Sequence, residues 1–216
     1  MQEHTALSHI RSLKPKITDR ALLAEIGRRG LTRAGCEAWL LQAAINKVNA
    51  FAFANDKGGH WCYYRNAEKY QEHEKTIGPT GIRTIPASPK AERITALIFV
   101  SPFDYLTYRH LRVKPEPEQM HIVTLGQTEE AAAVTIADPR IEKVIFFGNG
   151  DGSEHAFLAQ MDQQAFPVLV HEYEGLSDAF MTSPSSVAKS FAPAGPQADQ
   201  TQAASFTLRA AYRLAP

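Results

Sequence analysis

Residues 95–104 read Thr-Ala-Leu-Ile-Phe-Val-Ser-Pro-Phe-Asp, and this stretch decides the fold class. Its first six residues, 95–100, form a short continuous apolar run, which is typical of a strand buried in a parallel sheet. A helical pattern follows at once over Pro102–Leu111, with apolar residues on one side. A buried strand that leads directly into a helix predicts a βα unit.

The chain repeats this alternation of strand and helix towards its C-terminus. Further strands are predicted at residues 121–125, 143–147 and 168–171, and further helices at Thr128–Ala137, with Thr128 as its cap, and at residues 154–161. A glycine-rich turn over residues 148–153 joins the third strand to its helix. This order predicts an α/β fold, with a mainly parallel four-stranded sheet flanked by helices.

The N-terminal part has a different pattern. One helix is predicted between a cap at Thr18 or Asp19 and a stop at Gly30, and a second over residues 34–45. Two aromatic-rich runs, residues 50–54 and 60–65, flank a Gly-Gly turn and predict a β-hairpin. Residues 67–89 are polar and rich in glycine and proline, which favours a connection.

Three regions are therefore expected: a helical and hairpin region over residues 1–90, an α/β domain over 91–182, and a tail over 183–216. Residues 183–205 are rich in Ser, Pro, Ala and Gln, with a single aromatic residue. Such a segment buries too little apolar surface to offset its ordering entropy, so disorder is predicted for most of the tail.

Composition excludes several classes of protein. The 216 residues contain 23 basic and 23 acidic side chains and are 44% hydrophobic, which excludes a fully disordered chain and a strongly basic nucleic-acid coat. No apolar run approaches the roughly 18 residues of a membrane span, and the N-terminus lacks a signal-peptide pattern. With only two cysteines, a reducing cytoplasm is the expected compartment.

The neutral total hides a basic segment near the N-terminus. Residues 11–33 contain seven basic residues and two acids, a local charge of about +5. Such a segment either binds phosphate or forms a solvated helix face, and both interpretations stay open.

The order and spacing of these segments resemble a Toprim domain, the metal-binding α/β module of primases, topoisomerases and related nucleases. The resemblance is closest to Toprim-containing primase-like proteins of bacterial mobile elements, in which a small helical and hairpin region precedes the Toprim fold. It spans residues 11–182. Ser12-Leu13-Lys14-Pro15 and residues 51–59, leading to Tyr64-Arg65-Asn66, fit the preceding region.

This resemblance also shows where the chain departs from the family. The family has a glutamate at the end of its first strand and an aspartate four residues later, positions that fall on Val100 and Asp104. The two aspartates that hold magnesium after its third strand fall on Gly148 and Gly150, with Asn149 between them and Asp151 just beyond. The acidic segment that closes the family fold has its nearest counterpart at Asp178.

Magnesium takes hard oxygen ligands, which valine and glycine side chains cannot supply. Only Asp104 and Asp151 remain as candidate catalytic and metal-binding acids, with Glu154 one helical turn further on, so any magnesium site is expected to be weak. The sequence therefore predicts a degenerate Toprim fold without nuclease or primer-synthesising activity. The alternative is a weak magnesium-dependent nuclease or primase-type nucleotidyl transferase that uses Asp104 and Asp151.

Two of these residues have simpler interpretations. Asp104 is also suited to the first turn of a helix, where the dipole favours an acid. The loop at residues 148–153 either cradles a phosphate, with Asn149 and Ser153 beside it, or forms a tight turn whose Asp151 or Ser153 caps the next helix.

The resulting hypothesis is a DNA-associated or partner-binding module, with a replication or mobile-element protein as a possible partner. Phosphate contacts are expected from four arginines, Arg28, Arg29, Arg33 and Arg65. The strip of Trp61, Tyr63 and Tyr64 could stack bases, but strand alternation puts Trp61 and Tyr63 on one face and so favours the core for them. A protein-interaction domain with no nucleic-acid role is the third hypothesis.

Overall fold

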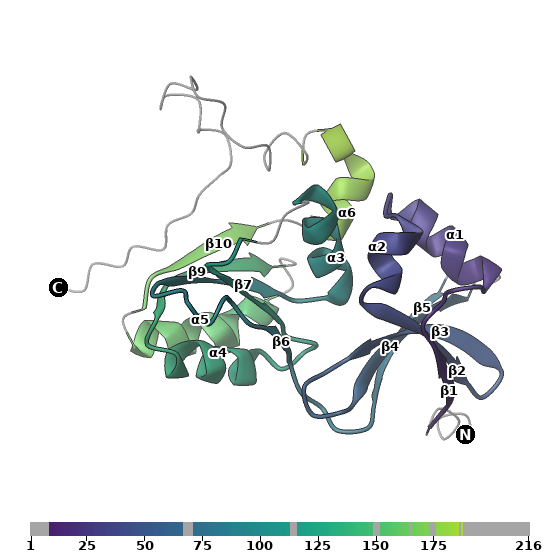
Figure 1. Ribbon diagram of the computed structural model, residues 1–216, viewed down its shortest axis with the longest axis horizontal. Helices are drawn as coiled ribbons and strands as arrows, with labels where there is room; N and C mark the ends of the chain where they lie inside the picture. The colour runs from purple at the N-terminus through teal and green to yellow at the C-terminus, as the bar shows by residue number, and fades with distance from the viewer. Residues whose placement is uncertain are drawn as a thin grey trace.

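A computed structural model describes residues 9–66, 71–112, 116–148, 152–164, 166–172, 176–185 and 187. Two five-stranded sheets organise this part of the chain (Figure 1). Sheet A has the order β1-β2-β3-β4-β5 and sheet B the order β10-β9-β7-β8-β6. Apart from residues 183–185 and 187, the expected tail lies outside the described residues.

Sheet A is antiparallel throughout and contains the predicted hairpin. Its strands are β1 (Ile10–Lys14), β2 (Leu40–Ile45), β3 (Val48–Ala54), β4 (His60–Asn66) and β5 (Gln71–Ile77). β3 and β4 form the hairpin, in which Ala54 pairs with His60. Its turn needs glycine, because Gly58 has a φ of 83° and a Cβ on Gly59 would lie 1.9 Å from the carbonyl oxygen of Pro79.

Two short helices precede β2. Helix α1 (Arg20–Arg28) begins where predicted, since the Asp19 side chain accepts hydrogen bonds from the first backbone N–H groups of the helix. Helix α2 spans only Arg33–Glu37. The prediction of a helix over residues 34–45 is wrong from Leu40 onwards, because β2 has buried residues on both faces and its apolar spacing therefore resembles that of a helix.

Sheet B contains the four predicted parallel strands. These are β7 (Ile94–Phe99), β8 (Gln119–Val123), β9 (Ile141–Gly148) and β10 (Val168–Glu172). A fifth strand, β6 (Arg83–Ile85), pairs antiparallel with β8 at the edge. The prediction of a mainly parallel four-stranded sheet is correct for these strands alone. Of sheet A the sequence predicts only the β3–β4 hairpin and not β1, β2 or β5. It does not predict β6 either, and the expected connection at residues 67–89 in fact contains β5 and β6.

Four helices cover the two faces of sheet B. Helices α4 (Thr128–Ala137) and α5 (Ser153–Gln163) pack on one face, with Ala132 and Phe157 in the same apolar cluster as Ile98 of β7. Helices α3 (Pro102–Leu111) and α6 (Leu176–Thr182) pack on the other. Thr128 is not the cap of α4: that position belongs to Gln127, whose side chain makes no capping hydrogen bond.

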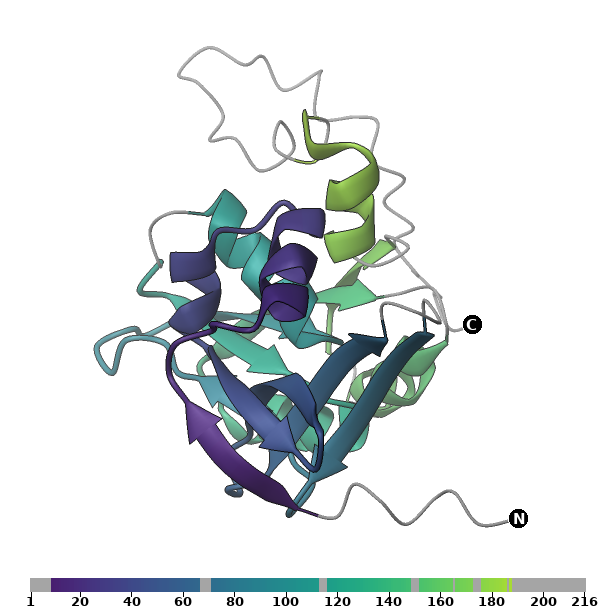
Figure 2. The ribbon, with the colours of Figure 1, turned by 90° about the vertical axis from the view of Figure 1, so that its right-hand side faces the viewer.

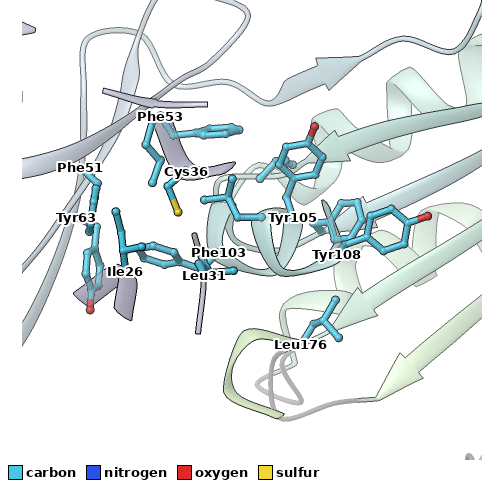
Figure 3. Packing of buried hydrophobic residues seen from close by; sticks show 14 of the residues in the cluster. Ile26, Leu31, Cys36, Phe51, Phe53, Tyr63, Phe103, Tyr105, Tyr108 and Leu176 are labelled. Carbon is cyan, nitrogen blue, oxygen red and sulfur yellow. The ribbon is translucent and has the colours of Figure 1, made fainter. Parts of the chain in front are cut away.

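The largest apolar cluster joins the two sheets. Phe51 and Tyr63 of sheet A contact the ring of Phe103 on α3 (Figure 3). Tyr105 of the same helix contacts Phe99 of β7. Helix α3 therefore lies between sheet A and sheet B, and its buried residues serve both. Among the described residues, no helix combines the length and the apolar character that crossing a membrane requires.

Candidate functional site

The retained acid Asp104 lies in the first turn of α3, just beyond the end of β7. Its side chain is 2% exposed. One carboxylate oxygen accepts a hydrogen bond from the Ser101 hydroxyl at 2.7 Å, and the other accepts the backbone N–H of Ser177 at 2.9 Å. Ser101 in turn caps α3 by accepting the Asp104 N–H. Both oxygens of this carboxyl group are therefore engaged within the fold.

The pKa of Asp104 is consistent with this buried position. Burial raises the pKa of Asp104 above its ordinary value, and the hydrogen bonds from Ser177 and Ser101 only partly oppose that effect. The geometry fits the simpler interpretation of a first-turn acid and adds a second role, which is to hold α6 against α3. The placement argues against the catalytic and metal-binding roles expected for Asp104.

The described ends of β7 and β9 supply no further acid, and the side chain of Glu172 at the end of β10 lies outside the described residues. Val100 follows β7 and packs against the core on the α4 and α5 side, and β9 ends at Gly148, which is buried. Within the described part of the chain, no three His, Cys, Asp or Glu side chains gather in a way that could hold a metal ion. The described residues thus do not fit a magnesium centre.

The glycine-rich loop is described only in part. Asn149, Gly150 and Asp151 lie outside the described residues, and Ser153 and Glu154 begin α5 with side chains that are also outside the description. The N-cap of α5 is Gly152, with a φ of 84° and no side-chain capping bond. The N-cap position therefore belongs to Gly152, and the capping roles considered for Asp151 and Ser153 concern side chains outside the described residues.

Three of the four arginines expected to bind phosphate instead gather around one buried acid, Glu25 of α1. Glu25 is 5% exposed. Its carboxylate accepts the Nε–H groups of Arg28 and Arg29, each at 2.8 Å, and lies 3.7 Å from a guanidinium nitrogen of Arg65. The Tyr63 hydroxyl donates to the same carboxylate at 3.1 Å.

Arg29 is the most deeply placed member of this group. It is 5% exposed, and its guanidinium carbon lies 3.8 Å from the centre of the Phe103 ring. Its remaining N–H groups donate to the Ser177 hydroxyl at 3.0 Å and to the Tyr63 hydroxyl at 3.3 Å. Arg29 therefore links α1, β4, α3 and α6, and its guanidinium group is engaged within the fold.

The pKa of Glu25 reflects the same arrangement. Burial alone would raise it, but the hydrogen bond from Arg28 and the positive charges of Arg29 and Arg28 hold the pKa of Glu25 below its ordinary value. Glu25 is therefore ionised at neutral pH. The buried Arg29 thus has a charged partner within the fold.

Arg28 and Arg33 are closer to solvent but also have acidic partners. Besides Glu25, Arg28 lies 3.4 Å from Glu72, and Arg33 donates to Glu37 at 2.8 Å. The spacing of Glu25, Arg28 and Arg29 along one helix was the sequence signal for this pairing, since residues three and four apart are neighbours on a helix.

A different set of cations remains exposed. Four basic residues on β1 and up to the start of α1 form no ion pair within the described residues: Arg11, Lys14, Lys16 and Arg20. The aromatic strip of β4 divides as alternation predicted, with Trp61 and Tyr63 buried at 5% and 1% exposure and Tyr64 partly exposed on the other face.

Comparison with known proteins identifies the fold. No family model and no curated protein sequence matches the chain. One similar solved structure is that of the bacteriophage T7 lagging-strand DNA polymerase, which interacts there with primase domains of two gp4 subunits bound to an RNA/DNA hybrid and dTTP. A chain of that structure matches this chain with 13% identity and a TM-score of 0.52. The match covers 76% of this chain and 88% of that one.

The primase fragment of the bacteriophage T7 primase-helicase protein matches at 14% identity and a TM-score of 0.51, over 76% of this chain and 71% of that one. At such identities the likeness concerns the fold alone. The described chain therefore has a primase-like fold.

Proposed function

We propose that this protein is a primase-like, nucleic-acid-associated module that lacks the magnesium centre of a working Toprim domain. The observation that carries the proposal is the position of Asp104. Its two carboxylate oxygens are taken by Ser101 and Ser177, and the carboxyl group is turned inside the fold rather than towards a substrate.

The strand ends support the same proposal. A phosphoryl-transfer centre of this kind relies on carboxylates that hold magnesium and stabilise the developing charge. Here the chain has Val100 after β7 and Gly148 at the end of β9, where the first side chain is apolar and the second residue has none. Without those ligands the fold keeps its shape but loses the chemical step.

Association with nucleic acid is supported by the likeness to primase domains and by the exposed cations of β1 and the start of α1. Arg11, Lys14, Lys16 and Arg20 project a local positive charge that no acid within the described residues neutralises by pairing. Phosphate contacts of such residues release counterions and make binding salt-dependent. These four replace Arg28, Arg29, Arg33 and Arg65 as the proposed contact residues.

The test is fluorescence anisotropy with labelled single- and double-stranded DNA, with and without magnesium, at two salt concentrations. Salt-sensitive binding that is indifferent to magnesium is expected. The double variant Lys14→Glu with Lys16→Glu should bind several-fold more weakly and lower the slope of log affinity against log salt by about 0.7–0.9 for each lost contact. The matched control carries the same charge change on exposed lysines remote from β1, Lys90→Glu with Lys143→Glu, and should bind like the wild type.

Two other outcomes of this experiment would each support a different function. Binding that requires magnesium, together with turnover that is lost in Asp104→Asn, would restore the alternative of an enzyme using Asp104 and Asp151. Absence of binding at both salt concentrations would reject the nucleic-acid role and leave the protein-interaction hypothesis.

A further inference from the structure

Sheet A has one face that no described helix covers. We call this the outer face, and it consists of the residues that point away from α1, α2 and α3. Its centre is made of small side chains at most 3% exposed, namely Ala43, Ala50, Ala52 and Cys62, and the partly buried side chains packed around them come from sheet A alone. Figure 2 shows the strands of sheet A in front, with α1 and α2 above them.

Strand register explains the shape of this face. Ala52 lies opposite Cys62, and Leu13 of the edge strand β1 lies opposite Ala43, so small residues form the floor and larger ones the sides. An open hollow of about 520 Å³ lies beside β1, where Ile10 and Leu13 approach His60 and Ile77. Leu13 is 40% exposed, more than any other leucine that the structure describes.

Charge separates sharply between the two faces of β5. His73 and Lys75 lie opposite Tyr64 and Cys62 and therefore belong to the outer face. Glu74 lies opposite the buried Tyr63 and belongs to the inner face. As Glu72 shares the inner side with Glu74, every acid of β5 points away from the outer face.

The other strands of sheet A also place no acid on the outer face. The outward positions of β1, β2, β3 and β4 carry no Asp or Glu. The outer face thus combines an apolar floor with the ammonium group of Lys75, and Arg11 lies at a bulge on its β1 edge. A partner that suits this surface is anionic and also has flat or apolar parts.

A ready aromatic platform lies beside Lys75. The Tyr64 ring stacks on the His73 ring, with centroids 4.7 Å apart and an interplanar angle of 16°. Tyr64 is partly exposed, and the rest of its side chain packs against the apolar centre of the outer face. Nucleobases stack on such rings irrespective of sequence, provided that they are not already paired in a duplex.

We infer that the outer face of sheet A binds a single strand of nucleic acid, with bases against Tyr64 and His73 and phosphates near Lys75 and Arg11. This inference rests on the proposed function and adds the surface and the kind of strand. A second copy of the chain is disfavoured on this face, because it would bring like charges together. An unpaired strand supplies the negative charge that this face lacks and the flat bases that can stack on its aromatic rings.

The direct test is photocrosslinking of the whole protein to a single-stranded oligonucleotide that contains 5-iodouracil, followed by mass spectrometry. Crosslinks are expected on Tyr64 or His73. In parallel, Tyr64→Ala should weaken single-strand binding by about fivefold or more, because one stacking partner is lost, whereas Tyr64→Phe should bind like the wild type. Lys75→Glu should weaken binding and lower the salt slope by about 0.7, while Lys90→Glu should do neither.

The possible failures can be told apart. If the wild type binds DNA, but crosslinks map elsewhere and both Tyr64→Ala and Lys75→Glu bind normally, the outer-face inference is overturned while the proposed function stands. If no DNA binds at all, both are rejected. A dimer in light scattering that Lys75→Glu disrupts would overturn the inference in favour of a second copy. Should Tyr64→Ala fail to fold by circular dichroism, the exposed Lys75→Glu and the crosslinks decide.

Discussion

Asp104 illustrates how a residue with a recognisable position can have a different role from the one its position indicates. The sequence places it in the right register for a Toprim acid, but its carboxyl group bonds to Ser101 and to the backbone of Ser177, 73 residues away. Neither the burial of Asp104 nor its contact with α6 is visible in the local sequence, where a solvated first-turn acid and a metal ligand look alike.

Replacing Asp104 separates the structural role from a catalytic one. Asparagine can still accept the Ser177 N–H and donate to Ser101, so Asp104→Asn should fold with nearly wild-type stability at neutral pH. Asp104→Ala should lower the free energy of unfolding by about 1–3 kcal/mol, because the buried N–H of Ser177 loses its acceptor. Urea unfolding followed by circular dichroism measures both.

The pH dependence of these variants has a definite sign. Since the folded state raises the pKa of Asp104 above its ordinary value of 3.8, protonation favours folding, and the contribution of this group is lost as pH rises through its raised folded-state pKa. Asp104→Asn should therefore gain stability relative to the wild type as pH rises from acid to neutral. A stability difference that does not change with pH would contradict the role of burial.

At the scale of elements, helix α1 makes buried contacts that join sheet A to the helices of sheet B, and it is not merely a solvated basic face. Glu25 and Arg29, one turn apart, are both 5% exposed, and Arg29 reaches Ser177 on α6. An ion pair at this depth stabilises only while both partners are present, because removal of one leaves a buried charge without compensation.

We expect Glu25→Gln to lower the free energy of unfolding by about 3–5 kcal/mol, because Arg29 then lacks its buried counter-charge. The matched change at an exposed pair, Glu142→Gln beside Arg93, should leave stability nearly unchanged, as such pairs contribute little. Chemical denaturation of both variants provides the comparison. Equal losses would show that the Glu25 pair is no more important than the surface one.

The contribution of the Glu25–Arg29 pair to stability should be lost at low pH. The folded state lowers the pKa of Glu25 below its ordinary 4.5, so the stability from this group is present above pH 4.5 and is lost as pH falls through its lowered folded-state pKa. Glu25→Gln should consequently flatten the acid side of the stability profile.

Two element predictions failed for identifiable reasons. The sequence of β2 predicts a continuation of the preceding helix, because both faces of this strand are buried and its apolar residues do not alternate. β5 was missed because it is an edge strand with the sequence Gln-Glu-His-Glu-Lys-Thr-Ile, in which only one residue is strongly apolar. The strands of sheet B were found because their runs are apolar and flanked by turns.

At the scale of the whole molecule, the two sheets share a core. Phe103 and Tyr105 of α3 pack against rings of sheet A, and Tyr105 also contacts Phe99 of sheet B. The expected division at residue 90 into an N-terminal region and an α/β domain stays a prediction, but the apolar core crosses that position. A shared core makes independent unfolding of the two parts costly.

We therefore expect a single cooperative unfolding transition. Both tryptophans, Trp39 and Trp61, lie on the N-terminal side, whereas Phe157 is fully buried in α5 on the far face of sheet B. Phe157→Ala should destabilise the protein by about 3–5 kcal/mol and shift the tryptophan fluorescence transition together with the far-UV circular dichroism transition. A fluorescence transition that stays in place would show that the two parts unfold separately.

Local patterns determined much of this protein: the alternation of strands and helices in sheet B, the Asp19 cap, the Gly-Gly hairpin and the inward position of Trp61 and Tyr63. These features depend on residues a few positions apart, so a single sequence contains their signal. Tertiary structure alone decided which charged residues face the solvent. Arg29 meets Ser177 from 148 residues away, and Asp104 meets the same serine from 73, so their roles arise only when α1, α3 and α6 pack together. Packing determines the burial of a charged group, and so its pKa and its freedom to bind a ligand.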